Sequence, residues 1–385
     1  NHLVGQWAKD WLEMYPGAKL LAANKADFEK ANRTKLMGRM ATGDYDAIII
    51  GHSMLAKMPV SPETRIQFVR KEVAFLERMK QEMIDAGMDK RKIAGINTKI
   101  SNLTQKLAAE IDQTKKDQVL FFEDTGIDHL TVDESHSFKN LGYHTQMQAV
   151  AGMNDPKGSK MAFDLYMKTG ALYANGGGVV FATGTPISNS LVEMYAILRY
   201  LNPQGLEERQ MDYFDAWLKT FAGIEEVTEY TATNSLKSRN VLTRFNNIPE
   251  LLQMYRQFAD TVTMDDLKRL YREAVEKRNA EKGEKERTDF PVPKVAGGQR
   301  QLITVPISAQ QRLFVDYLTL RAKVMEDMGG KERKEYATVD NPLWVYGDAR
   351  KAALDIRIID PTAPDEGGSK VNRAVETIRA VYERS

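Results

Sequence analysis

Two short segments of this chain place carboxylates, an imidazole and hydroxyls directly after apolar runs. Residues 130–140, LTVDESHSFKN, contain Asp133 and Glu134 directly after an apolar, β-branched run, and His136 follows two places later. Residues 179–186, VVFATGTP, contain a second such run that ends in two threonines. A short apolar run that is bounded by polar residues is typical of a buried strand. We therefore expect carboxylates, an imidazole and hydroxyls at the ends of two strands.

This combination of groups suits phosphoryl transfer. That reaction needs Mg²⁺ on the phosphate oxygens and a carboxylate that positions the attacking water. Mg²⁺ is commonly held by one or two carboxylates with water and phosphate, so we expect Asp133 to hold it through its water shell. Glu134 would orient or deprotonate the water, and His136 with Thr183 or Thr185 would link the γ-phosphate to movement elsewhere. A solvated turn is the alternative for an Asp-Glu pair after a strand.

The residues around both segments resemble a known family. DESHSFKN, from Asp133 to Asn140, resembles motif II of the Swi/Snf-like family of superfamily-two helicases. Residues 179–203, VVFATGTPISNSLVEMYAILRYLNP, resemble motif III of that family and the helix that follows it. The resemblance implies an α/β fold of the RecA-like type, with a doubly wound parallel sheet. It also implies an ATPase that uses ATP and Mg²⁺ and moves along double-stranded DNA.

Two earlier segments resemble the parts of this family that grip the DNA backbone. Residues 2–16, HLVGQWAKDWLEMYP, resemble motif Ia, and residues 44–55, DYDAIIIGHSML, resemble motif Ib. Backbone amides at a helix start and small polar side chains suit phosphate oxygens without reading the base sequence. The residues that the resemblance places at the DNA are Gln6, Gly51, His52, Ser53 and Thr183. Loop capping is the alternative function for the polar side chains of the first two segments.

Composition limits the classes of function. The 385 residues are 42% apolar, which is ordinary for a globular chain of two or three domains. No apolar run approaches the roughly 18 residues that a bilayer span requires. The absence of cysteine excludes disulfides and thiolate metal sites and agrees with a cytoplasmic location. Because the formal net charge is only +1, any DNA-binding surface must be a local basic patch.

Alternating patterns predict the elements that position the N-terminal segments. We expect a helix over residues 2–15, a strand over 19–23, a helix over 27–42 and a strand over 46–50. Strands that alternate with helices favour a parallel, doubly wound sheet. Trp7 repeats with other apolar residues at helical spacing, so we expect it in the core.

Residues 61–117 follow a different pattern. Apolar residues repeat at alternating threes and fours in two runs, and Gly87 separates the runs. This pattern predicts a helical hairpin, in the manner of an antiparallel coiled coil, inserted between motifs Ib and II. Its charges are mixed in sign, so a solvated spacer or partner surface is favoured over an arm that tracks DNA.

These patterns divide the chain into three parts. Residues 1–245 would form a first RecA-like lobe that is incomplete at its N-terminus. The charged, helical residues 246–290 would form a linker or protrusion. Residues 291–385 would begin a second RecA-like lobe, incomplete at its C-terminus, with a strand over 300–306 and a helix over 308–323.

The sequence does not contain a phosphate-binding loop of the form G-x-x-x-x-G-K-[ST]. The resemblance places this loop before motif Ia, and it places the arginine finger and motifs IV to VI after Ser385. The N-terminal Asn1 is preceded by no initiator Met, and no basic leader follows. We therefore expect the central piece of a helicase or translocase that is inactive by itself.

Two other functions remain open. A helicase-like module could bind DNA or protein without hydrolysing ATP. A metal hydrolase could use Asp133, His136 and His144, although their spacing does not place a ligand set on adjacent turns or strands. The chain also resembles the helicase part of large phage and mobile-element proteins that often carry an adenine-specific DNA methyltransferase. Such a methyltransferase is therefore an expected neighbour in a parent protein.

Overall fold

The acidic segment and the threonine segment follow two paired parallel strands. β3 (His129–Val132) and β4 (Gly178–Phe181) pair with Val132 opposite Phe181. The crossover between them contains η3 (Ser135–Phe138) and α6 (Lys160–Ala174). Gly176 ends the α6 segment with φ of 75°, a backbone conformation that glycine adopts without strain. Because the strands are parallel and in register, their carboxyl ends lie side by side.

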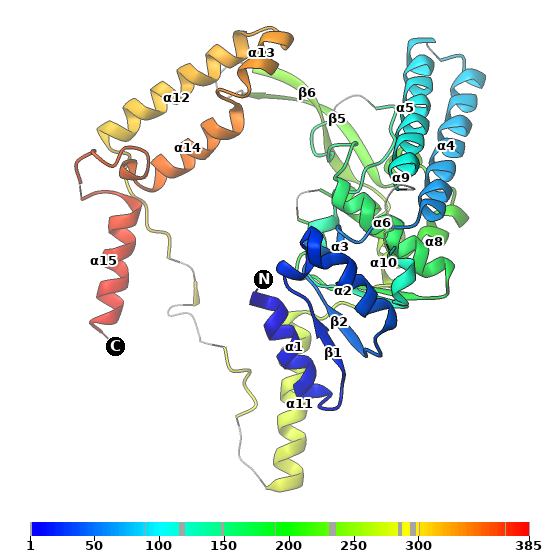
Figure 1. Ribbon diagram of the computed structural model, residues 1–385. Helices are drawn as coiled ribbons and strands as arrows, with labels where there is room; N and C mark the ends of the chain where they lie inside the picture. Colours follow the sequence, from blue (N-terminus) through cyan, green and yellow to red (C-terminus); the bar gives the residue numbers. More distant parts are fainter. Residues whose placement is uncertain are drawn as a thin grey trace. The chain divides into compact units, whose positions relative to one another are not determined.

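This description comes from a computed structural model (Figure 1). It describes residues 2–88, 90–114, 120–147, 150–188, 190–230, 236–283, 287–292, 298–299, 301–365 and 367–384. The chain divides into two compact units. Unit 1 contains residues 1–225 and 240–260, and unit 2 contains residues 226–239 and 261–385.

The N-terminal elements of unit 1 follow the predicted order of helix, strand, helix and strand. They are α1 (His2–Met14), β1 (Leu20–Ala22), η1 (Ala26–Phe28), α2 (Lys30–Thr42), β2 (Ala47–Ile49) and α3 (His52–Leu55). β1 and β2 are parallel, with Leu21 opposite Ile48. The predicted α/β class is therefore confirmed.

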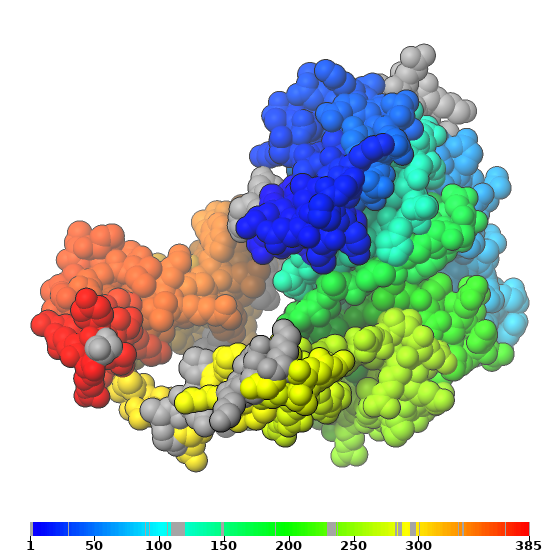
Figure 2. Space-filling model, turned by 90° about the horizontal axis from the view of Figure 1, so that it is seen from below, coloured from blue at the N-terminus to red at the C-terminus, as the bar shows by residue number. Residues whose placement is uncertain are grey.

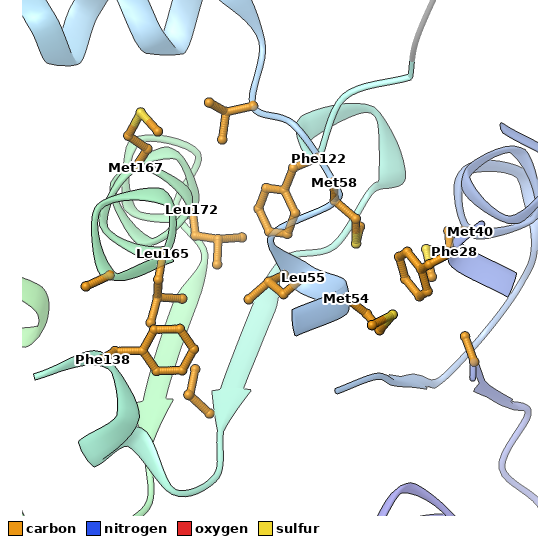
Figure 3. Packing of buried hydrophobic residues seen from close by; sticks show 14 of the residues in the cluster. Phe28, Met40, Met54, Leu55, Met58, Phe122, Phe138, Leu165, Met167 and Leu172 are labelled. Carbon is orange, nitrogen blue, oxygen red and sulfur yellow. The ribbon is translucent and has the colours of Figure 1, made fainter. Parts of the chain in front are cut away.

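The predicted RecA-like, doubly wound sheet is not shown. Within the described residues, β1 pairs only with β2 and β3 only with β4, so two separate two-stranded parallel sheets take its place. Each strand is three or four residues long. Apolar side chains, not backbone pairing, join the two sheets in one core. In Figure 3, Met54, Leu55 and Met58 lie between Phe28 and Met40 on one side and Leu165 and Phe138 on the other.

The predicted helical hairpin is present. α4 (Pro62–Asp85) and α5 (Lys90–Thr114) run side by side in Figure 1 and share a small core of their own. Residues 115–117 of the predicted range lie outside the described residues.

Two polar contacts hold the first half of α4. The backbone N–H of Ser61, the N-cap of α4, donates to Glu123 Oε2 at 3.0 Å. Glu72 of α4 lies 2.7 Å from His144 Nε2. Burial is the largest single influence on Glu72 and raises its pKa, but the hydrogen bond to His144 and the charges of His144 and Arg199 together outweigh burial and leave that pKa below its usual range. The first half of α4 is thus joined to the chain on both sides of β3.

A second core lies among the helices that follow β4. They are α7 (Val192–Leu201), α8 (Pro203–Glu208), α9 (Phe214–Phe221) and α10 (Ile248–Arg256), whereas η2 (Glu123–Thr125) precedes β3. Trp217 is fully buried there. Between α9 and α10 the chain forms a two-stranded sheet of β5 (Ala222–Tyr230) and β6 (Leu236–Phe245). The sequence patterns do not predict this sheet.

Unit 2 is mainly helical in its described part. Its helices are α11 (Met264–Lys282), α12 (Ala309–Asp327), α13 (Gly330–Tyr336), α14 (Pro342–Leu354), η5 (Ile356–Ile358) and α15 (Lys370–Tyr382). The helix predicted over 308–323 is confirmed, but the strand predicted over 300–306 is wrong. Residues 301–306 form no strand, and Leu302 is 89% exposed, because no described strand pairs with them; Arg300 lies outside the described residues.

Candidate functional site

Asp133 lies directly after β3 and is contacted at three of its oxygen atoms. The backbone N–H of Glu134 donates to Asp133 Oδ1 at 2.9 Å. The indole Nε1 of Trp7 donates to Asp133 Oδ2 at 3.2 Å. The ring nitrogen His52 Nε2 lies 2.8 Å from the Asp133 carbonyl oxygen. Trp7 of α1 and the turn itself therefore orient the carboxylate, and His52 of α3 contacts the backbone of the same residue. Residues 133–136 are called the acidic tip below.

Glu134 has a left-handed backbone conformation, with φ of 48° and ψ of 45°. For a residue with a Cβ atom this conformation costs roughly 1–2 kcal/mol. This turn directs the next backbone N–H, that of Ser135, toward β4, where it donates to the Ala182 carbonyl at 3.0 Å. The strained residue thus joins the acidic tip to the end of β4 and leaves the Glu134 carboxylate exposed. Strain of this kind is concentrated at functional sites in proteins.

His136 joins the acidic tip to the threonine segment. Its Nδ1 atom lies 3.1 Å from Glu134 Oε2, 3.1 Å from Thr183 Oγ1 and 3.4 Å from Thr185 Oγ1. The N–H of Thr185 also donates to Thr183 Oγ1 at 3.1 Å. A ring nitrogen donates when it carries a proton and accepts when it does not. His136 can therefore donate to Glu134 in one protonation state and accept from a threonine in the other.

An ion pair lies behind the tip. Lys139 Nζ is 2.9 Å from Glu193 Oε1, and the Glu193 side chain is fully buried. Glu193 Oε2 accepts from the Ser188 N–H at 2.7 Å. Through Glu193 of α7, these two contacts connect the end of η3 with the loop after β4. It supports the relative position of the two segments that carry the chemistry.

Most residues predicted to face DNA lie on α1 and at the start of α3, and Thr183 lies in the segment after β4. Gln6 is exposed on α1, and Ser53 is exposed on α3. Gly51 is the N-cap residue of α3. His52 packs against Phe138, with ring centroids 4.9 Å apart, and directs Nε2 to Asp133. The imidazole of His52 is thus engaged with the acidic tip.

The prediction that Trp7 belongs to the core is wrong. Trp7 is 37% exposed, and α1 lies at the surface of unit 1, in dark blue in Figure 2. Apolar residues at helical spacing identify α1 as a helix, but several of them, such as Leu12 and Met14, are also exposed. Helical spacing does not distinguish a buried face from a face that borders a site. The sequence pattern therefore does not indicate the hydrogen bond from Trp7 to Asp133.

The oxygen atoms of the tip fit Mg²⁺. Among the described residues, no group of three or more His, Cys, Asp or Glu side chains could hold a metal ion. Mg²⁺ does not require such a group, because water and phosphate complete its shell around one or two carboxylates. Asp133, the residue predicted to hold the ion, would offer one such carboxylate, and Glu134 lies next to it for the attacking water. His144 pairs with Glu72 at 2.7 Å, so the metal-hydrolase alternative is not supported.

The carboxyl ends of parallel strands are a common place for ligand sites in α/β folds. A family described as a probable helicase domain matches residues 3–263, which is more than half of the chain. The chain belongs to this family. Among the described residues, every helix is too short or too polar to cross a membrane.

A phage protein shows a more distant similarity. The chain is 22% identical over 248 residues to the Defense against restriction protein B of Escherichia phage P1. The match covers 62% of this chain but only 11% of the length of the phage protein. No solved structure matches the chain. The helicase part of the sequence resemblance is thus supported, and the Swi/Snf-like assignment stays a prediction.

Proposed function

We propose that this chain is the central part of an ATP-dependent DNA helicase or translocase of the Swi/Snf-like type. The observation that carries the proposal is the meeting of the acidic tip with Thr183 and Thr185 at adjacent strand ends. His136 lies within 3.4 Å of both hydroxyls and of the Glu134 carboxylate. Membership of the helicase-domain family supports the same conclusion.

Each polar group then has a role in ATP hydrolysis. Asp133 holds Mg²⁺, which neutralises charge on the phosphate oxygens when bound. Glu134, with its exposed carboxylate, orients the attacking water and accepts its proton. When Glu134 accepts this proton, His136 shifts its hydrogen bond from Glu134 to Thr183 or Thr185. The loop after β4 thereby follows the state of the nucleotide.

Double-stranded DNA is the proposed partner, bound by phosphate contacts at Gln6, Gly51, Ser53 and Thr183. Because the formal net charge of the chain is +1, such binding depends on local contacts. Affinity should fall by roughly 0.9 log units per log unit of salt for each phosphate neutralised. Binding that does not change with salt would contradict phosphate contacts.

An active motor also needs a phosphate-binding loop and an arginine finger, which other parts of a longer protein would supply. We expect ATP hydrolysis that is stimulated by duplex DNA in such a protein and no hydrolysis by this chain alone. In the longer protein, Glu134→Gln should lower turnover by about 10²- to 10⁴-fold, the usual contribution of a general base. Glu207→Gln, the same change at an exposed position of α8, is the matched control.

The outcomes separate the candidate functions. Retained turnover in Glu134→Gln would contradict the assigned role, and DNA-stimulated turnover by this chain alone would contradict its inactivity. A longer protein that binds DNA but never hydrolyses ATP would support the non-catalytic module.

A further inference from the structure

Two side chains from the proposed DNA-binding elements reach the proposed metal ligand. Trp7 of α1 donates to the Asp133 carboxylate at 3.2 Å, and His52 of α3 contacts the Asp133 carbonyl oxygen at 2.8 Å. Both contacts span long sequence separations, of 126 and 81 residues. Neither contact is required for the local turn at Asp133, because the Glu134 N–H already supports that turn.

We propose that Trp7 and His52 are positioning residues that couple DNA binding to the geometry of Asp133. This inference rests on the proposed function. DNA phosphates that bind α1 and the start of α3 fix the positions of these two elements. Trp7 and His52 then hold the carboxylate and the backbone of Asp133 in one orientation. DNA stimulation of hydrolysis follows from this alignment.

The chemistry of Trp7 suits this role. An indole N–H only donates, so its contact with Oδ2 is a hydrogen bond of one fixed direction. The Glu134 N–H holds Oδ1 at 2.9 Å, so each carboxylate oxygen has one donor and keeps a lone pair for a water of the Mg²⁺ shell. Hydrogen bonds weaken steeply with distance and misalignment. A small shift of α1 therefore releases one side of the carboxylate.

His52 acts on the backbone of the same residue. It follows Gly51, directly after the end of β2, and its ring is half-buried against Phe138. Within the described residues, no backbone pairing connects the β1–β2 sheet to the β3–β4 sheet. The contact of His52 with Asp133 is thus a polar connection between the N-terminal elements and the acidic tip.

The first test compares two tryptophans on one helix. Trp7→Phe keeps an aromatic ring and removes the N–H donor. Trp11→Phe is the matched control, because Trp11 packs against Tyr15 in a tilted arrangement, with ring centroids 5.6 Å apart. In the longer, DNA-stimulated protein, Trp7→Phe should lower the maximal stimulation by about tenfold, the effect of one hydrogen bond to a charged group. The DNA concentration that gives half of that stimulation should change by less than about threefold, since Trp7 itself contacts Asp133.

The second readout does not depend on turnover. Addition of a short DNA duplex to this chain, without nucleotide, should change the tryptophan fluorescence. The change should be absent in Trp7→Phe, reduced in Asp133→Asn and retained in Trp11→Phe. A change that survives in Trp7→Phe would overturn the proposal, because it would come from another tryptophan.

His52 provides an independent check. His52→Gln keeps an N–H donor that can reach a carbonyl oxygen, so it should retain DNA stimulation. His52→Leu should lose it by about tenfold. Equal stimulation in both variants would overturn the role of His52. This pair also tests the proposal if Trp7→Phe does not fold.

Failure of the inference differs from failure of the proposed function. If Glu134→Gln hydrolyses ATP normally, the proposed function fails. If Glu134→Gln is inactive while Trp7→Phe matches Trp11→Phe in stimulation and fluorescence, only the coupling role is overturned.

Discussion

The acidic tip and the region beneath it, which contains the buried pairs Lys139–Glu193 and Lys168–Asp164, differ in how their polar groups are paired. At the tip, Glu134 is exposed, and His136 Nδ1 lies within hydrogen-bonding distance of three different oxygen atoms. Beneath the tip, Glu193 is fully buried and paired with Lys139 at 2.9 Å. Lys168 is also fully buried and is bonded to Asp164. The tip offers alternative partners, whereas the region beneath it offers fixed ones.

Lys168 shows why fixed partners matter for position. Its ammonium donates to the Leu55 carbonyl at 2.8 Å, which holds the last residue of α3. Burial lowers the pKa of Lys168 and raises the pKa of Asp164, and their attraction opposes both effects. Buried charges of this kind are strongly destabilising when one partner is removed. We therefore expect changes beneath the tip to affect stability and changes at the tip to affect function.

The largest effect on stability should come from Glu193→Ala. The change leaves the Lys139 ammonium, only 15% exposed, without its carboxylate. We expect the free energy of unfolding to fall by about 3–5 kcal/mol, as for other broken buried pairs. Urea unfolding followed by circular dichroism measures this. Glu13→Ala, which breaks the exposed pair of Lys9 and Glu13, is the control and should change stability by less than about 1 kcal/mol.

A smaller loss is expected for Lys168→Met. The Asp164 side chain keeps 18% exposure, so water relieves part of its lost pairing. We expect a loss of about 2–3 kcal/mol, measured in the same way. The double variant Lys168→Met with Asp164→Leu removes both charges and should recover part of this loss. If the double variant is less stable than Lys168→Met, the charges are not the cause.

The smallest effect should come from Glu134→Gly at the tip. Glycine adopts the left-handed conformation without strain, but it also loses more conformational freedom on folding. These two effects nearly cancel, so we expect a change within about 1 kcal/mol together with loss of the carboxylate's function. Gln210→Gly, at another left-handed position with φ of 56°, is the matched control. A loss above about 2 kcal/mol would show that the Glu134 side chain supports the fold.

The sequence predicted local elements well because their signals are local. Apolar periodicity identified β3, β4 and both helices of the hairpin, and the family resemblance identified the residues at the strand ends. The strand predicted over 300–306 is wrong because a strand also requires a partner, and residues 301–306 have none among the described strands. The sequence did not predict the pair of β5 and β6 because their charged residues interrupt the alternation of apolar and polar residues that identifies a strand.

The contacts that complete the site could not be predicted from local patterns. Ser190 and Glu193 match a capping box for α7, yet α7 begins at Val192 and Glu193 pairs with Lys139 instead. Trp7 matches a core position, yet it donates to Asp133. In each case the partner is distant in sequence, so the choice between local and distant partners depends on tertiary packing. Such residues are functional candidates that only a structure reveals.

The helical hairpin is braced along most of its first helix. Ser61 with Glu123 holds the start of α4, Glu72 with His144 holds its middle, and Arg78 pairs with Asp212 at 3.4 Å. Only the last seven of the 24 residues of α4 extend past Arg78, a length of about 11 Å at 1.5 Å per residue. The hairpin therefore stiffens both flanks of the strand that carries Asp133 and leaves only a short overhang.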